Sequence, residues 1–459
     1  MQCILVHHPA FVESLLFIKA LTGSGPRTPI AAMRLTSLLL VIAATASADD
    51  HRLRRHRLRA RADTSNLPIT RDGSALLLNG EPWKAVGPNV YWLGLDENVI
   101  PPAGEPFYSP SNASYPTKGR TTEVMAIVKA LGGTMIRAHT LGVSTGNPLS
   151  VWPEEGVVNE QAFESIDWAV FQARAFGLRL LVPLTDNYDY YHGGKYNFLR
   201  WAGFNLTQAA DANNPHIQQF YTNETIVDSF KEYIHTLLTH VNPYTNLTYA
   251  EDPTIFAYES GNELAGPVWA DMNVPTEWVE DIAAYVKSLA PEKLFVDGTY
   301  GVNQTHLGAE NVDIFSDHFY PISIAKLQKG LDLVASVNKS YFAGEYDWVG
   351  STDGGATSNG DSLADWFRVI EQSSVTAGDA FWSLFGHNVP DCSVFVNHTD
   401  GFTLQYGNPE YSPYTDSRIQ LIHQHSVKLS QGVNISANAS LPVVPCPASP
   451  DGGSRLFKS

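Results

Sequence analysis

The sequence predicts an α/β fold: a (β/α)₈ or TIM barrel, formed by a single catalytic domain with long βα loops. From residue 83 onward, short apolar runs alternate with longer amphipathic runs, which is typical of βα units around a parallel sheet. Eight such apolar runs occur between residues 83 and 385. A doubly wound sheet would need a glycine-rich phosphate loop after its first strand, and the sequence has none there.

The predicted strands are the apolar runs themselves, and the predicted helices are the amphipathic runs between them. The strands are expected at 83–93, 134–140, 179–185, 255–263, 294–298, 314–320, 341–345 and 380–385. The helices are expected at 123–131, 162–176, 226–241, 277–289, 325–337, 363–377 and 416–429. No helix is evident after the fifth strand, so this βα unit is expected to be irregular.

The N-terminal region divides into segments that precede the barrel. A basic start at residue 33, an apolar run over 38–44 and small residues at 46–48 predict a signal peptide at 33–48. Residues 1–32 are interpreted as an upstream mis-start, and the arginine-rich segment 49–61 as a pro-segment. The catalytic domain is expected over 62–433, followed by a C-terminal tail over 434–459.

Composition agrees with an exported protein. The net charge is −17, which disfavours nucleic-acid binding because that function needs a basic surface. Removal of the signal peptide leaves no predicted membrane segment, so we expect a secreted, extracellular protein. N-x-[ST] sequons, typical of secreted glycoproteins, occur nine times: at Asn112, Asn205, Asn223, Asn246, Asn303, Asn338, Asn397, Asn434 and Asn438.

Cysteine is scarce in the predicted mature chain. Cys3 lies upstream of the signal peptide, which leaves Cys392 and Cys446. An extracellular location permits disulfides. We therefore predict one disulfide that joins the C-terminal tail to the last barrel loop.

Two carboxylates stand where chemistry is expected in such a barrel. Glu263 ends the predicted fourth strand and Glu345 ends the seventh. Active sites of these barrels are built at the C-terminal ends of the strands, so the two side chains can face one pocket. A pair of carboxylates that flanks a glycosidic bond hydrolyses it, with retention of configuration at a separation of about 5–5.5 Å. The pair predicts a glycosidase.

These motifs resemble the retaining glycoside hydrolases of clan A, family 5, and among them the endo-β-1,4-mannanases of fungi and plants. The resemblance runs from about Gly73 to Gln431. Asn262-Glu263 is similar to the strand-four Asn-Glu of the family, which implies that Glu263 is the acid/base and that Asn262 binds the sugar 2-hydroxyl. The segment 342–345, Phe-Ala-Gly-Glu, is similar to the strand-seven Gly-Glu, which implies that Glu345 is the nucleophile.

The resemblance implies roles for further residues. Arg137 matches the strand-two arginine that supports the nucleophile. His318 and Tyr320 match the strand-six His-x-Tyr, whose tyrosine bonds the nucleophile, and their spacing places both side chains on one face of the strand. Trp382 matches the strand-eight tryptophan that floors the −1 subsite.

The segment 186–195, followed by Trp201-Ala202, is similar to the loop after strand three of the mannanases. It implies that Asn187 and Trp201 bind substrate. Three motifs depart from the family pattern. Tyr258-Glu259 stands where the family has Trp-Glu before the acid motif. Leu264-Ala265 stands where the family has Pro-Arg after the acid/base, and Tyr346-Asp347 where it has Phe-Gly after the nucleophile.

The resemblance implies a mannan endo-1,4-β-mannosidase, a carbohydrate-degrading enzyme that acts on plant cell-wall mannan or galactomannan. Retaining carboxylate chemistry needs no cofactor or metal, and we expect a monomer. Other family 5 β-glycanases, cellulase-like or exo-acting, remain open, as does a non-catalytic wall-binding glycoprotein. The segment 142–146 matches the G-x-S-x-G esterase elbow, but the Asn147-Pro148 that follows opposes the helix such an elbow needs. No H-E-x-x-H or C-x-x-C metal-binding spacing occurs in the sequence.

Overall fold

The computed structural model describes residues 64–97, 113–206, 215–265, 274–350, 360–398, 400–436, 439–447, 449 and 451. The expected upstream segment, signal peptide and pro-segment all lie outside these residues, as do the sequons at Asn112 and Asn438. Within the described part of the chain, no helix combines the length and the apolar character needed to cross a bilayer.

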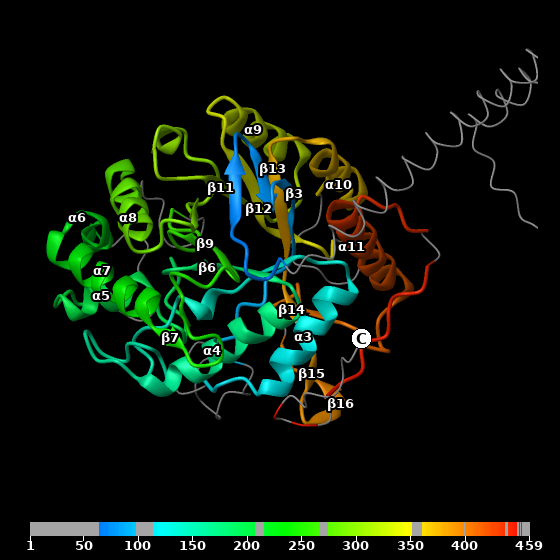
Figure 1. Cartoon of the computed structure of the whole chain (residues 1–459), viewed down its shortest axis with the longest axis horizontal. Coiled ribbons are helices and arrows are strands. Elements are labelled where there is room, and N and C mark those ends of the chain that lie inside the picture. The colour runs from blue at the N-terminus through cyan, green and yellow to red at the C-terminus, as the bar shows by residue number, and fades with distance from the viewer. Residues whose placement is uncertain are drawn as a thin grey trace, which may run out of the picture. The chain divides into compact units, whose positions relative to one another are not determined.

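An eight-stranded parallel sheet forms the centre of the fold, as predicted (Figure 1). Its hydrogen-bonded order is β4-β13-β12-β11-β10-β9-β6-β5. The two end strands also meet, because the Val90 N–H donates to the Arg137 carbonyl at 3.0 Å and Asn89 bridges Arg137 in parallel. The sheet is therefore a barrel. Its strands are β4 (Ala85–Pro88), β5 (Met135–Arg137), β6 (Arg179–Pro183), β9 (Ile255–Glu259), β10 (Leu294–Asp297), β11 (Ile314–Phe319), β12 (Ser340–Asp347) and β13 (Thr376–Trp382).

The barrel strands are apolar because both of their faces are covered. Every residue of β9 and β12 is buried, including the glutamates Glu259 and Glu345. Parallel strands enclosed by helices read as continuous hydrophobic runs, and this pattern is what made them visible in the sequence. The charged residues within them are therefore exceptions that need partners.

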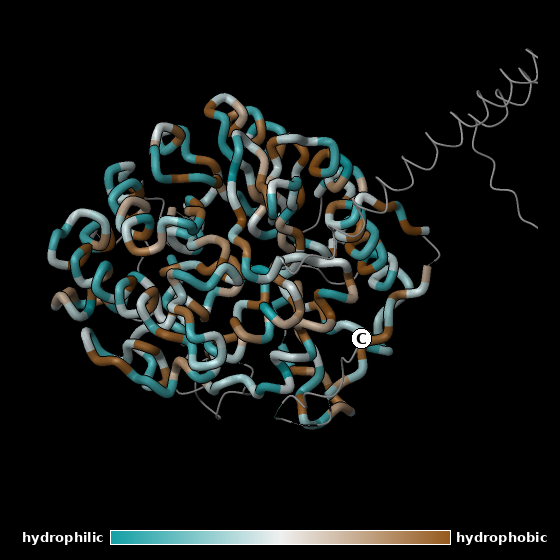
Figure 2. The backbone as a smooth tube through the Cα atoms, viewed as in Figure 1, coloured by the Kyte–Doolittle hydropathy of each residue, from teal (hydrophilic) through white to brown (hydrophobic). Residues whose placement is uncertain are grey.

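Helices surround the strands (Figure 1), and their polar and apolar residues alternate along the backbone in Figure 2. Side-chain caps set several of the helix starts: Asn159, Ser323 and Ser412 each accept a backbone N–H at an N-terminus. The larger helices are α3 (Lys118–Ala130), α4 (Glu160–Ala175), α7 (Glu224–Thr239), α8 (Thr276–Leu289), α9 (Ile324–Ala335), α10 (Leu363–Gln372) and α11 (Pro413–Gln431). Between β10 and β11 the described chain has only a 3-10 turn, Gln304–His306, as expected.

The N-terminal end of the barrel, where the parallel strands begin, is closed by a small antiparallel sheet that the sequence analysis did not predict. It consists of β1 (Ile69–Asp72), β2 (Ala75–Leu78) and β3 (Glu81–Trp83). Ile69 and Leu76 pack with the first residues of several barrel strands, and the Trp83 ring meets Phe256 edge-on at 5.3 Å. This sheet covers the N-terminal ends of the strands and leaves the C-terminal ends for the site.

Several predicted boundaries were wrong. The fourth strand ends at Glu259, so Glu263 follows this strand and does not end it, and the eighth strand already begins at Thr376. The seventh helix does not continue to residue 377: α10 ends at Gln372, and Thr376 already pairs with Tyr341 of β12. The β-branched pair Val375-Thr376 fits the sheet, so strand pairing prevails over helical periodicity. The first strand is shorter than predicted, because Trp83 belongs to the antiparallel β3.

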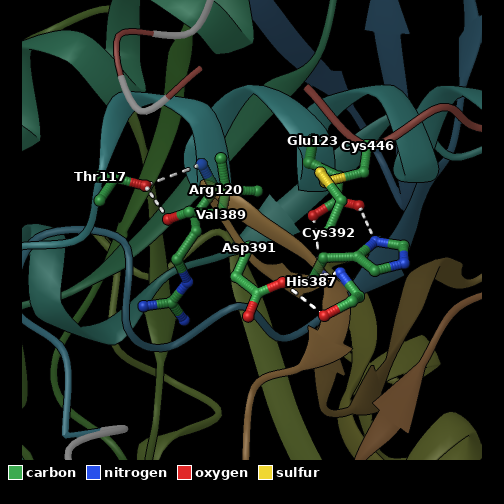
Figure 3. Close-up of a disulfide and its surroundings, with 9 residues drawn as sticks. Thr117, Arg120, Glu123, His387, Val389, Asp391, Cys392 and Cys446 are labelled. Carbon is green, nitrogen blue, oxygen red and sulfur yellow. Dashed lines mark hydrogen bonds and ion pairs between the residues drawn. A yellow bond between two sulfur atoms is a disulfide. The ribbon is translucent and has the colours of Figure 1, made fainter. Parts of the chain in front are cut away.

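The predicted disulfide is present (Figure 3), with Cys392 Sγ bonded to Cys446 Sγ. Cys392 lies in the hairpin of β15 (His387–Asn388) and β16 (Asp391–Phe395), after the last barrel strand, and Cys446 lies in the C-terminal tail. Tyr406 also holds the tail, since its hydroxyl donates to the Pro442 carbonyl at 2.6 Å. The tail is thus fastened to the loop region that follows β13.

Candidate active site

Glu263 and Glu345 meet at the C-terminal end of the barrel. Glu345 lies within β12, whereas Glu263 lies four residues beyond the end of β9 at Glu259. An oxygen of one carboxylate lies within 4.8 Å of an oxygen of the other. Both side chains are buried, with 7% of Glu263 and 5% of Glu345 exposed. Glu263 has φ +50°, a left-handed backbone that a residue with a Cβ rarely adopts and that marks many functional sites.

The Glu345 carboxylate is surrounded by donors. Arg137 Nη1 donates to Oε1 at 2.7 Å, and the Tyr320 hydroxyl donates to Oε2 at 2.9 Å. Burial raises the pKa of Glu345 above its ordinary value, and His318, Arg137 and the Tyr320 bond oppose the rise. These groups stabilise the ionised carboxylate, which is the form that can act as a nucleophile.

The Glu263 carboxyl has a different environment. One oxygen, Oε1, lies 2.6 Å from His318 Nδ1, and the other, Oε2, accepts a hydrogen bond from the Tyr188 hydroxyl. Burial raises the pKa of Glu263 to about 7, and the Tyr188 bond limits the rise. Glu263 is thus able to carry a proton near neutrality, as a general acid must. Two carboxyl groups with unlike surroundings indicate separate acid and nucleophile roles.

Arg137 organises the floor beneath the pair. Its guanidinium also donates to both oxygens of Glu259, at 2.7 and 3.0 Å, and to the side-chain oxygens of Asn89 and Asn262, at 3.0 and 2.9 Å. Burial alone would lower the Arg137 pKa, but Glu259 and Glu345 raise it above its usual value. Arg137 therefore stays charged, and it links Glu345 to Asn262, the residue before Glu263.

Gly344 allows His318 to approach the carboxylates. A Cβ at this position would lie 2.4 Å from Ser316 Oγ and 2.9 Å from His318 Nε2, which is closer than such atoms pack. His318 Nδ1 lies 3.6 Å from Glu345 as well as 2.6 Å from Glu263. The glycine before Glu345 therefore makes room for the imidazole between the two carboxyl groups.

Both carboxylates line a cavity of about 460 Å³, and many of the other lining residues are aromatic. The Trp382 ring stacks on Tyr91 at 5.0 Å with an interplanar angle of 5°, and its indole N–H donates to Asp400 Oδ2 at 2.7 Å. Aromatic faces of this kind pack against sugar rings. The lining consists of Tyr91, Glu97, His139, Asp186, Tyr188, Tyr190, Tyr191, His192, Asn262, Glu263, Tyr300, Tyr320, Glu345, Trp382, His398, Asp400 and Phe402.

Most of the residues predicted from the sequence converge here. Lining the cavity are Asn262, Glu263, Tyr320, Glu345 and Trp382, and just behind it Arg137 and His318 contact the carboxylates.

The structure does not place Asn187 and Trp201 among the described residues that line the cavity. The Asn187 side chain is buried and accepts a hydrogen bond from Lys195. Trp201, at the end of α5 (Lys195–Trp201), packs at 5.2 Å from Phe198 and at 6.3 Å from Trp152. Asn187 therefore lies buried within the loop after β6, and Trp201 packs in the core beside that loop.

Several residues of the site escaped the sequence analysis. Glu259 was visible as an acidic residue that ends a buried strand, a placement that demands a partner. Tyr188 was visible only as one of several tyrosines in the loop after β6. No sequence pattern marked Asn89 and His139 as site residues, because their place in the site depends on contacts with Arg137, which is distant from Asn89 in the sequence.

Glu263, His318 and Glu345 also form an oxygen and nitrogen ligand set that could hold a cation. The guanidinium of Arg137, 2.7 Å from Glu345, already supplies positive charge there and opposes a second cation. A second group of possible ligands, Glu123, His387 and Cys446, includes a sulfur that is bonded in the disulfide. Neither group favours a metal over the ion pairs present.

Comparisons with known proteins agree with the geometry. The chain is 32% identical to mannan endo-1,4-beta-mannosidase 2 of Oryza sativa subsp. japonica over 266 residues, which are 57% of this chain and 54% of the relative. It is 29% identical to mannan endo-1,4-beta-mannosidase 1 of Arabidopsis thaliana over 236 residues, 51% of each chain. The chain spans about half the length of the curated relatives it matches.

Solved structures share the fold. The endo-1,4-beta-mannanase of Rhizomucor miehei superposes with a TM-score of 0.61 at 22% identity, covering 79% of this chain and 99% of that one. The endo-beta-1,4-mannanase of Thermotoga petrophila gives 0.58 at 21% identity, covering 78% and 80%. A family model described as GH family 5 beta-mannosidase-like matches residues 69–328, more than half of the sequence. The chain belongs to the GH family 5 beta-mannosidase-like family.

Proposed function

We propose that this protein is a retaining endo-β-1,4-mannanase that hydrolyses β-mannosidic linkages of mannan or galactomannan. The observation that carries the proposal is the pair of buried carboxyl groups, with oxygens within 4.8 Å, in an aromatic-walled cavity. That proximity suits the retaining class, which has about 5–5.5 Å between the carboxyl groups, better than the wider inverting class.

In the first step, Glu345 attacks the anomeric carbon while Glu263 gives its proton to the departing glycosidic oxygen. Arg137 and the Tyr320 hydroxyl favour the ionised form of Glu345, which attacks, and burial favours the protonated form of Glu263, which transfers its proton. In the second step, Glu263, now a carboxylate, removes a proton from water, and this water releases the sugar from Glu345. Asn262 stands beside the acid/base and faces the cavity, where it can bond the sugar 2-hydroxyl.

The choice of mannan rests on the relatives, which are named as mannan endo-1,4-beta-mannosidases. The aromatic stack of Trp382 on Tyr91 supports a sugar-binding floor without deciding between mannose and glucose. Leu264-Ala265, in place of the expected Pro-Arg, keeps another β-glycanase as the alternative substrate class. We further propose that the protein is secreted and works as a monomer on the plant cell wall, in line with its leader-like segment and its sequons.

The test is the release of reducing sugar from galactomannan, carboxymethylcellulose, xylan and laminarin, with sizing of the products. We expect activity on galactomannan and internal cleavage that gives a range of oligosaccharides. Activity confined to a glucan or xylan would contradict the mannan assignment, and release of mannose alone would contradict endo action.

Glu263→Gln and Glu345→Gln should each abolish turnover while the fold remains intact by circular dichroism. The matched control is Glu310→Gln, which removes an exposed glutamate outside the cavity lining. Near-wild-type rates in either cavity variant would refute the assigned roles. No turnover by the wild-type protein on any of the four polysaccharides would support a non-catalytic glycoprotein.

A further inference from the structure

Tyr188 contacts the acid/base directly. Its hydroxyl donates to Glu263 Oε2, while His318 Nδ1 lies at 2.6 Å from Oε1. The two carboxyl oxygens therefore have different partners from different elements, namely the loop after β6 and strand β11. His318 also lies 3.6 Å from Glu345, so it serves both carboxylates, whereas Glu263 is the carboxylate that the Tyr188 hydroxyl bonds.

The surrounding loop fixes the Tyr188 ring. The Tyr188 backbone N–H donates to Asp186 Oδ1 at 3.0 Å, and the ring stacks on Tyr190 at 5.3 Å with an interplanar angle of 8°. Asp186 is itself held by His192 Nε2 at 2.9 Å from Oδ2. Because both the backbone and the ring are held, the hydroxyl is directed at Glu263 before substrate arrives.

A hydrogen bond donated to a carboxyl oxygen favours the charged form over the neutral form. During proton transfer to the leaving group, negative charge develops on Glu263 in a buried cavity, where burial penalises it. The Tyr188 hydroxyl is in place to stabilise that charge when it appears and to hold the carboxylate as the base of the second step.

We propose that Tyr188 is a positioning residue for the acid/base: its hydroxyl orients Glu263 and stabilises the carboxylate that Glu263 becomes when it gives up its proton. This inference rests on the proposed glycosidase function and assigns a role at the same site. The proton moves from Glu263 to the glycosidic oxygen, and Tyr188 keeps its own proton throughout. Burial raises the Tyr188 pKa far above its usual value, in agreement with a hydroxyl that donates and does not ionise.

Tyr188→Phe tests the proposal, because it removes the hydroxyl and keeps the stacked ring. Tyr190→Phe is the matched control, since it removes a hydroxyl from the neighbouring ring of the same loop and leaves the bond from Tyr188 to Glu263 in place. The first readout is the pH dependence of kcat/KM. Loss of a bond to a charged group should move the alkaline limb upward by about one pH unit in Tyr188→Phe and leave it in place in Tyr190→Phe.

The second readout compares leaving groups. A β-linked mannooligosaccharide needs a proton to depart, whereas the dinitrophenolate of a dinitrophenyl β-mannobioside departs without one. At acidic pH, Tyr188→Phe should lower kcat/KM about 10-fold on the oligosaccharide and less than about 2-fold on the aryl glycoside. Equal losses on both substrates, with the alkaline limb unmoved, would overturn the proposal and leave Tyr188 a packing or substrate-contact residue.

The third readout does not depend on turnover. Titration of the Glu263 side-chain carboxyl carbon by ¹³C NMR should move upward by about one pH unit in Tyr188→Phe. An unchanged titration would overturn the proposal even in an active enzyme. Failure of the wild-type protein to cleave either substrate would instead contradict the proposed function, and this outcome is separate from a failure confined to the Tyr188 variant.

Discussion

Glu259 and Arg137 form a two-bond fork beneath Glu263 and Glu345: Arg137 Nε donates to Glu259 Oε2 at 2.7 Å, and Arg137 Nη2 donates to Glu259 Oε1 at 3.0 Å. Neither side chain is exposed to solvent. The third guanidinium nitrogen donates to Glu345. Glu259 therefore shares the charge of Arg137 with Glu345 and fixes the plane in which Arg137 meets that carboxylate.

Glu259→Gln should weaken both the fold and the reaction. The amide offers one acceptor oxygen and turns an NH₂ group toward the N–H groups of Arg137, so one buried bond is lost. We expect the free energy of unfolding to fall by about 3 kcal/mol, with at least a ~10-fold loss of kcat/KM as Arg137 loses its orientation. Chemical denaturation and steady-state kinetics measure the two effects.

The matched control for this prediction is an ion pair at the surface. Lys231 pairs with Asp281 at 2.6 Å, with the Asp281 side chain about half exposed. Asp281→Asn should change the free energy of unfolding by less than ~1 kcal/mol, because solvent screens exposed pairs. If Glu259→Gln lowered the free energy of unfolding no more than this control does, the fork between Arg137 and Glu259 would not stabilise the fold.

The eight strands and the carboxylate pair were predictable because each rests on local sequence. Buried parallel strands are continuous apolar runs; Glu263 follows one such run closely, and Glu345 lies within another. The fork of Arg137 with Glu259 was not predictable in this way. It joins residues 122 positions apart, and the sequence around either residue does not indicate which distant residue it contacts.

The strands that the sequence did not predict, and the wrong placement of Trp201, also have physical explanations. The strands β1 to β3 are too short for their periodicity to stand out, and their apolar residues gain meaning only by covering the barrel end. Trp201 shows the ambiguity of a single aromatic residue, since the same side chain can line a pocket or pack in a core. Here its contacts with Trp152 and Phe198 place it in packing.

Gly344→Ala should impair the reaction more than the fold. The added methyl would meet Ser316 Oγ and His318 Nε2, so the imidazole must move away from the carboxylates. A shift of this kind should lower kcat/KM by at least ~10-fold and the free energy of unfolding by about 1–3 kcal/mol. Kinetics with a mannooligosaccharide and thermal denaturation provide the measurement.

Gly308→Ala is the control for Gly344→Ala, because a Cβ at that exposed position has no neighbour within 4 Å. The double variant Gly344→Ala/Ser316→Ala removes one of the two obstructing atoms. It should recover part of the lost activity if steric displacement is the cause. Wild-type activity in the single variant would show that His318 needs no such clearance.

Glu263→Gln should alter how stability depends on pH. The Glu263 pKa is about 7 in the folded protein, against an ordinary value of 4.5, chiefly because burial disfavours the charge. The folded protein therefore holds this proton more tightly than the unfolded chain does. The resulting stabilisation is fully present below pH 4.5 and is lost as the pH rises through 7. Wild-type Glu263 therefore lowers the free energy of unfolding increasingly as the pH rises, whereas a glutamine at this position cannot ionise and has no such effect.

The stability of Glu263→Gln relative to the wild type should therefore increase with pH, by up to ~3 kcal/mol between pH 4.5 and pH 8. Urea denaturation across this range measures the difference, and Glu310→Gln controls for the loss of a carboxylate from the surface. A difference that stayed flat would mean that Glu263 ionises as easily in the folded protein as in the unfolded chain. In that case Glu263 would lack the bound proton that the acid step requires, so the stability measurement also tests the role of Glu263 in the reaction.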